Sequence, residues 1–163
     1  MAIKMGNGDT MTAKQKYLIM AGAALALVGA MGGYIVAETT VPAHQDAERV
    51  AKGADLYTQN CASCHGARLE GQPNWRSPDS DGYMPAPPHD ASGHTWHHPI
   101  TQLFAVTKFG TAALVGNGYQ SRMEGFDDEL SDDQILDILA YIKSTWPADV
   151  QARHDQIDAA SGG

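Results

Sequence analysis

The amino-acid sequence predicts an all-α fold preceded by a single membrane-spanning helix. Apolar residues recur at helical spacing in three segments, and residues that favour helix ends flank these segments. An N-terminal run contains no charged side chain over residues 17–37. The helices expected in the folded part cover residues 46–60, 99–110 and 131–147.

The first of these helices carries an apolar stripe formed by Val50, Ala54 and Tyr57. The acidic residues Asp46 and Glu48 stand at its start, where the helix dipole stabilises negative charge. Both observations place the beginning of the helix near residue 46.

The second and third helices have their own end signals. Pro99 opens the second, because proline is favoured in the first turn, and Gly110 closes it. In the third, Ser131 and Gln134 have the spacing of a capping box, and Pro147 prevents continuation. The third helix is therefore the most strongly predicted element.

Two segments next to these helices are expected to lack long helices. Residues 111–118 are small and contain glycine, which predicts a loop. Residues 148–163 are predicted to form a C-terminal tail with at most a short amphipathic turn before its glycine-containing end.

The uncharged run 17–37 is long enough to cross a bilayer as a helix, and it is longer than the apolar core of a typical signal peptide. Lysines precede it and Glu38 follows it, so the positive-inside rule places the N-terminus in the cytoplasm and exports the rest. A cleaved signal peptide is the alternative, with Ala37 or Ala43 at the processing site.

A retained anchor would hold the folded part close to the membrane. The linker between them, residues 38–45, spans at most roughly 27 Å when fully extended. The predicted organisation is a cytoplasmic N-terminus (1–16), a transmembrane anchor (17–37), a short linker (38–45), a folded domain (46–147) and a C-terminal tail (148–163).

The strongest chemical signal is the run Cys61-Ala62-Ser63-Cys64-His65. Two cysteines at this spacing can each form a thioether to the same porphyrin, and the histidine after them is placed to ligate the iron. A redox dithiol and half of a zinc site use the same cysteine spacing. The sequence has no second cysteine pair and no βαβ pattern, so covalent haem c is the favoured interpretation.

From Asp46 to Trp146 the chain resembles a class I c-type cytochrome domain. The haem-binding run lies near the start of this region, a methionine lies late in it, and the terminal helix contains an aromatic residue. The resemblance implies an all-α domain built around one covalent haem. It also implies that Gly53 lets the terminal helix approach closely beside Tyr141.

The resemblance extends to the ligands of the iron. It implies His65 as one axial ligand and Met123 as the other, with Met84 as the rival for the second position. A proline carbonyl is expected to hold the second ring nitrogen of the histidine, and Pro73 is the candidate, with Trp75 packed on the haem edge. Two filled axial positions leave no open site for a substrate, which predicts an electron carrier rather than an enzyme.

Four histidines crowd into one stretch with a different potential use. They could bind copper or zinc, or replace the methionine on the iron. Their spacing fixes no coordination geometry, so a loop that wraps the haem edge is the favoured interpretation. The four residues are His89, His94, His97 and His98.

The formal net charge is −8, with 19 acidic residues against 11 lysines and arginines. This balance argues against nucleic-acid partners and favours a redox partner with a basic docking surface, although an acidic surface also serves solubility alone. Together with the resemblance, it predicts a one-electron carrier between a quinol-cytochrome c oxidoreductase and a terminal oxidase. The carrier is expected to sit in the inner membrane of a bacterium with its haem domain in the periplasm.

Two other functions remain open from the sequence. One is a permanent haem c subunit of a larger membrane oxidoreductase, which a short tether would suit equally well. The more distant one is a copper-handling protein or a peroxidase that uses the histidine-rich stretch. No small-molecule substrate is expected for the carrier.

Overall fold

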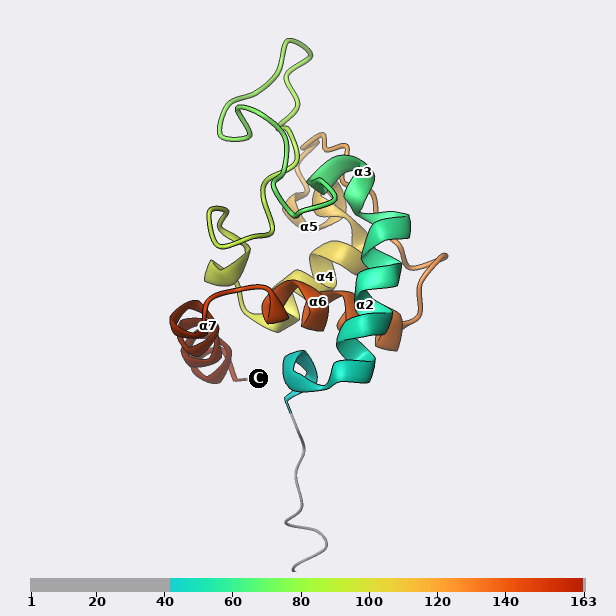
Figure 1. Ribbon diagram of the computed structural model, residues 1–163. Helices are drawn as coiled ribbons and strands as arrows, with labels where there is room; N and C mark the ends of the chain where they lie inside the picture. Colours follow the sequence, from blue (N-terminus) through green and yellow to red (C-terminus); the bar gives the residue numbers. More distant parts are fainter. Residues whose placement is uncertain (1–41, 163) are drawn as a thin grey trace, which may run out of the picture. The chain divides into compact units, whose positions relative to one another are not determined.

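The computed structural model describes residues 42–162. This part of the chain contains helices and loops and no strand, which confirms the predicted all-α class (Figure 1). None of its helices has the length and apolarity needed to cross a membrane, and the predicted anchor at 17–37 lies outside the described residues. The elements are η1 (Ala43–Gln45), α2 (Ala47–Asn60), α3 (Ala62–His65), η2 (Thr95–His97), α4 (Ile100–Phe109), α5 (Thr111–Val115), α6 (Asp132–Ser144) and α7 (Ala148–Ala160).

The predicted starts of α2 and α6 are confirmed. The Asp46 side chain accepts hydrogen bonds from the backbone N–H groups of Glu48 and Arg49, at 3.0 and 3.2 Å. Ser131 and Gln134 form the reciprocal capping box at the start of α6. Both helices thus begin where their own side chains satisfy otherwise unpaired N–H groups.

Helices α2 and α6 cross in direct contact at Gly53 (Figure 1). A Cβ atom on Gly53 would lie 1.9 Å from the carbonyl oxygen of Asp137 and 2.9 Å from Cβ of Tyr141, so the expected close approach is confirmed. The Asp137 side chain is only 4% exposed, and it pairs with Arg49 at 2.6 Å and Lys52 at 3.2 Å. The crossing therefore combines backbone contact with a compensated buried carboxylate.

The loop expected over residues 111–118 is partly wrong, because its first half forms the short helix α5. Gly110 separates α4 from α5 and adopts a φ of 80°, a conformation that glycine reaches without steric cost. The backbone N–H of Thr111 donates to the carbonyl of Met123 at 3.2 Å. This contact ties the start of α5 to the segment that precedes α6.

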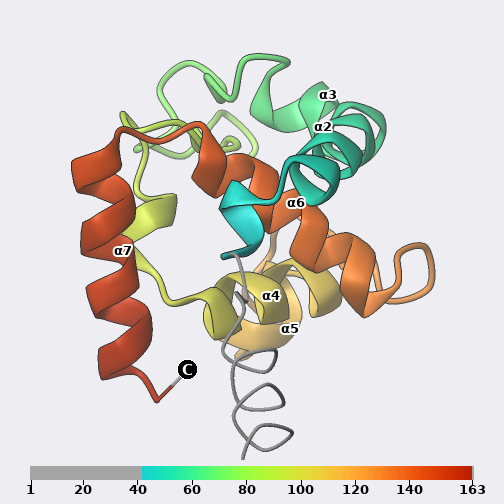
Figure 2. The same cartoon turned by 60° about the horizontal axis from the view of Figure 1, so that its bottom comes forward.

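The C-terminal tail forms a complete helix, α7, rather than the short turn that was predicted. It lies alongside η2 (Figure 2). Its buried residue is His154, 1% exposed, whose Nε2 donates to the carbonyl of His98 at 3.1 Å. The Asp158 carboxylate accepts the backbone N–H of Ile100 at 2.6 Å. These polar contacts, together with Val150 packed against the core, fix the helix to the domain.

Asp158→Ala should lower the free energy of unfolding by at least about 1 kcal/mol, because Ile100 at the start of α4 loses its acceptor and buried His154 loses the carboxylate 3.1 Å from its Nδ1. Urea unfolding of the holoprotein, followed by far-UV circular dichroism, measures the change. Asp128→Ala is the matched control, since Asp128 is exposed and the substitution removes the same charge. Equal losses in the two variants would show that Asp158 does not cap α4.

Candidate haem site

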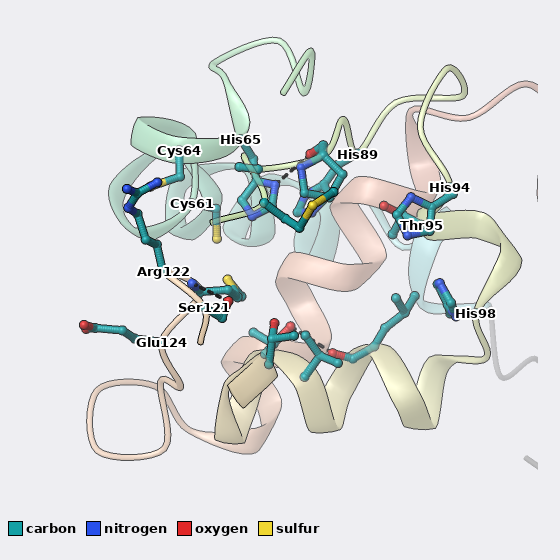
Figure 3. A pocket seen from close by; sticks show the side chains of 18 of the residues that line it. Cys61, Cys64, His65, His89, His94, Thr95, His98, Ser121, Arg122 and Glu124 are labelled. Atoms are coloured by element: carbon teal, nitrogen blue, oxygen red, sulfur yellow. Dashed lines mark hydrogen bonds between the residues drawn. The ribbon is translucent and has the colours of Figure 1, made fainter. Parts of the chain in front are cut away.

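A cavity of about 1120 Å³ is enclosed by residues of α3, α4, α5 and α6 and of the loops between them (Figure 3). Its volume lies slightly above the range of about 300–1,000 Å³ that is typical of small-molecule sites. Cys61, Cys64 and His65 all belong to its wall. The structure therefore gathers the whole sequence motif at one cavity.

His65 is buried, with 6% of its surface exposed, and its ring is oriented by one hydrogen bond. Nδ1 donates to the carbonyl oxygen of Pro87 at 2.9 Å, because a carbonyl can only accept. The proton is thus on Nδ1, and Nε2 keeps its lone pair for a metal. Burial lowers the pKa of His65, which keeps the imidazole in the neutral, ligating form.

The acceptor for His65 was predicted to be Pro73, and this is wrong. Pro73 is exposed and does not line the cavity, whereas Pro87 does. The backbone at Gly71 packs directly against that of Pro87 and Pro88. A Cβ atom on Gly71 would lie only 2.4 Å from the backbone nitrogen of Pro88. This packing brings the carbonyl of the preceding residue, Pro87, to the histidine ring.

Residues 73–85 form a loop that leaves the domain and returns to it, visible in green in Figure 1. Its two ends are joined by Gln72 and Ala86. The N–H of Gln72 donates to the carbonyl of Ala86 at 2.8 Å, and Oε1 of Gln72 accepts the N–H of Ala86 at 2.9 Å. We call this segment the 73–85 loop. It separates Gly71 from Pro87 in sequence while leaving them adjacent in space.

Trp75, the other residue predicted beside the cofactor, lies in the cavity wall. Its ring stacks on His94 at a centroid distance of 5.2 Å, and the guanidinium of Arg76 lies 4.0 Å from its centroid. The position is compatible with contact to a bound group, and its role there stays a prediction.

The two cysteines do not have the properties of a redox dithiol. Cys61 is buried and Cys64 is exposed. Burial, and secondarily the neighbouring Cys64, raises the pKa of the Cys61 thiol to about 11. Reactive dithiols depend on the opposite shift, toward the thiolate. The geometry therefore favours cysteines that serve as attachment points.

The four histidines of the histidine-rich stretch do not share one neighbour, although the rings of His94 and His98 meet edge to face at a centroid distance of 5.2 Å. The ring of His89 stacks on that of His65 at a centroid distance of 3.9 Å. The ring of His97 stacks on that of Trp96 at a centroid distance of 3.6 Å. The ring of His94 stacks on that of Trp75. Over residues 42–162, the one group of three converging ligands is His154, Asp155 and Asp158. Lys143 Nζ already lies 2.5 Å from a carboxylate oxygen of Asp155. The histidine-rich stretch thus provides no set of three converging ligands.

The cavity wall fits a large, flat and mainly apolar group. Leu103 and Val106 of α4 line it, and both are only partly buried by protein atoms. Leu114 and Val115 of α5 also line it and are 46% and 51% exposed. Apolar side chains that the protein leaves uncovered around a cavity are the expected lining for a porphyrin. Residues of α6 complete the wall, namely Ile138, Leu139 and Ile142.

Both candidate sulfur ligands, Met123 and Met84, belong to the cavity wall. Figure 3 shows the segment around Met123, labelled at Ser121, Arg122 and Glu124, on the opposite side of the cavity from His65. Met123 belongs to this segment and lines the cavity. The backbone of Met123 is held by one nearby residue, Ser121, and by one on another element, Thr111 of α5.

Comparison with known proteins agrees with this geometry. Residues 50–146, more than half of the chain, match the cytochrome c family. No curated protein matches the chain. The crystal structure of cytochrome CL from the marine methylotrophic bacterium Methylophaga aminisulfidivorans is similar with a TM-score of 0.47 and 21% identity, covering 94% of this chain and 80% of that one. On the family match and the gathered Cys61, Cys64 and His65, the chain belongs to the cytochrome c family, as a class I c-type cytochrome with covalently bound haem c.

Proposed function

We propose that the protein is a membrane-tethered one-electron carrier that passes electrons from a quinol-oxidising complex to a terminal oxidase or another membrane acceptor. The observation that carries this proposal is a haem cavity with His65 on one side and a methionine-bearing segment on the other. When bound, haem c supplies reversible one-electron chemistry. The protein supplies two axial ligands, an apolar enclosure and a docking surface.

His65 and Met123 are the proposed axial ligands. The backbone of Met123 is held on both sides: its N–H donates to Oγ of Ser121 at 3.0 Å, and its carbonyl accepts from Thr111 at 3.2 Å. A ligand on a fixed backbone loses less conformational entropy when it binds. A thioether stabilises ferrous iron and raises the reduction potential, which suits electron delivery to an oxidase.

Met84 is the weaker candidate for the same position. It lies three residues before Pro87, whose carbonyl holds His65, so its segment belongs to the histidine side of the cavity. Its side chain is more exposed than that of Met123. Among the described residues, no backbone hydrogen bond holds Met84 itself. These contrasts favour Met123.

The proposed docking surface is the mouth of the cavity. Tyr119 lines the cavity and is 40% exposed, and we place the partner's approach to the haem at this part of the wall. The net charge of −8 predicts a partner with a basic rim. The rate of electron transfer to the partner should therefore fall as ionic strength rises.

The tether and the location are part of the proposal and rest on the sequence. The uncharged run 17–37, with lysines before it, supports a single span in a bacterial inner membrane with the haem domain in the periplasm. A tethered carrier meets its partners at a high effective concentration, because both share one membrane.

Membrane vesicles that contain the full chain test the function. We expect added quinol to reduce the haem and oxygen to reoxidise it, with the protein remaining in the membrane pellet at high salt. The control replaces residues 1–40 with a cleavable signal peptide, which should release the haem domain into the soluble fraction. Haem that responds to neither quinol nor oxygen would contradict the carrier role. Stable co-purification with an oxidoreductase in mild detergent would indicate a permanent subunit instead.

A further inference from the structure

Arg122, the residue before the proposed ligand Met123, reaches across to the 73–85 loop. Its Nη1 pairs with Oδ2 of Asp79, and its Nη2 donates to Oδ2 of Asp81 at 2.9 Å. The centre of the guanidinium lies 4.2 Å from the ring centroid of Tyr83, in cation–π geometry. One side chain thus contacts three residues of a loop that lies about forty positions away in the chain.

Hydrogen bonds within the 73–85 loop hold Asp79 and its turn in place independently of Arg122. Oδ1 of Asp79 accepts the backbone N–H groups of Asp81 and Tyr83, at 2.9 and 3.0 Å, and the Asp79 N–H donates to the Tyr83 carbonyl at 2.9 Å. Asp79 therefore closes the turn with one carboxylate oxygen and holds Arg122 with the other. Hydrogen bonding from Arg122 lowers the pKa of Asp79, which keeps this carboxylate ionised at neutral pH.

We call the contacts of Arg122 with Asp79, Asp81 and Tyr83 the clamp. The clamp joins the two chain segments that carry the candidate methionine ligands. Arg122 is bonded to Met123, and Tyr83, beneath the guanidinium, is bonded to Met84. Both methionines line the haem cavity. One guanidinium therefore restrains the two segments that carry a sulfur ligand.

We propose that Arg122 is a positioning residue that keeps Met123 on the haem iron by tying its segment to the 73–85 loop. This inference rests on the proposed ligation by Met123. Surface ion pairs contribute little to folding stability, and the side chains of Arg122 and Asp81 are 51% and 69% exposed. The clamp instead affects the equilibrium between Met123 bound to the iron and Met123 released from it. A small free-energy change is enough to alter the fraction of protein in which the methionine is released.

Imidazole binding to the ferric full-length protein in detergent measures that equilibrium, because imidazole binds only when the methionine has left. We expect Arg122→Gln to bind imidazole about tenfold more tightly than the wild type, equivalent to about 1.4 kcal/mol. The imidazole affinity of Arg122→Lys should lie between those of the wild type and Arg122→Gln, since lysine keeps the positive charge but cannot bind two carboxylates through separate guanidinium nitrogens. Asp81→Asn should give a smaller increase in imidazole affinity, because it weakens one contact of Arg122 and leaves the turn formed by Asp79 intact.

Two controls separate positioning from general effects. Arg153→Gln makes the same charge change on α7, where Arg153 lies over Trp96, and should leave imidazole affinity unchanged. Raising the salt concentration should increase imidazole affinity in the wild type and not in Arg122→Gln, because salt screens the clamp. A structural role elsewhere in the fold would not produce this salt dependence.

The outcomes distinguish the clamp from the ligand assignment. Equal imidazole affinity in the wild type, Arg122→Gln and Asp81→Asn would overturn the clamp while leaving Met123 as the ligand. If the wild type already binds imidazole as tightly as Met123→Ala does, the proposed ligation is wrong and the clamp has nothing to position.

Discussion

Replacing Met123 with alanine is expected to abolish the weak long-wavelength absorption band that arises from sulfur bound to ferric iron. The thioether that favours ferrous iron is then lost, so the reduction potential should fall. Axial ligands set haem potentials over a range of about 0.8 V, and we expect a fall on the order of 200 mV. Optical spectra and a redox titration of the full-length protein measure both effects.

The matched control is Met84→Ala, which removes the other methionine of the cavity wall. It should leave the band and the potential close to those of the wild type. Circular dichroism checks that both variants retain their helices. If Met84→Ala loses the band and Met123→Ala keeps it, the assignment of the sixth ligand is reversed.

Gly53→Ala is expected to destabilise the domain severely, although alanine is the better helix former. In an open helix the exchange would stabilise by up to about 1 kcal/mol. Here the added Cβ would lie 1.9 Å from the carbonyl oxygen of Asp137, a backbone atom that cannot rotate away. Overpacking usually costs about 1–3 kcal/mol, and we expect about 3 kcal/mol or more because backbone must move.

Chemical unfolding of the haem-loaded protein measures this loss. Gly118→Ala serves as the control, since Gly118 has a φ of 77° and nothing within 4 Å of its added Cβ. Its cost should come from the left-handed backbone alone, about 1 kcal/mol. Similar losses in the two variants would show that the helix crossing tolerates a side chain at Gly53.

The elements that the sequence predicts well are those whose signals are local. Asp46 at the start of α2 and the Ser131–Gln134 capping box mark helix ends through residues two or three positions away. The Cys61–His65 motif is equally local. Such features can be predicted from the sequence because they are defined by residues close together in the chain and need no contact with a distant segment.

The acceptor for His65 was missed because it depends on a contact between distant residues. Gly71 and Pro87 are neighbours in space, but the 73–85 loop separates them in the chain. The family resemblance implies a proline shortly after a glycine in the loop behind the motif, and in this sequence that gave Pro73. A signal was present in the extended stretch before His89, where consecutive prolines leave carbonyls free to accept.

Helix α7 was missed for a different physical reason. Its residues form no apolar stripe, and periodicity of apolar residues is the main sequence signal for a helix. Apart from Val150, which packs against the core, it is fixed by polar contacts of His154 and Asp158 to residues more than fifty positions earlier. Such partners can be identified only once the fold is known.

The proposed electron transfer depends on a porphyrin bonded covalently to Cys61 and Cys64. Acid–acetone extraction of the denatured full-length protein tests this directly, because it removes haem that is held by ligation alone. We predict that the haem stays with the polypeptide and that Cys61→Ala/Cys64→Ala releases it. Wild-type protein that loses its haem to the solvent would contradict the account.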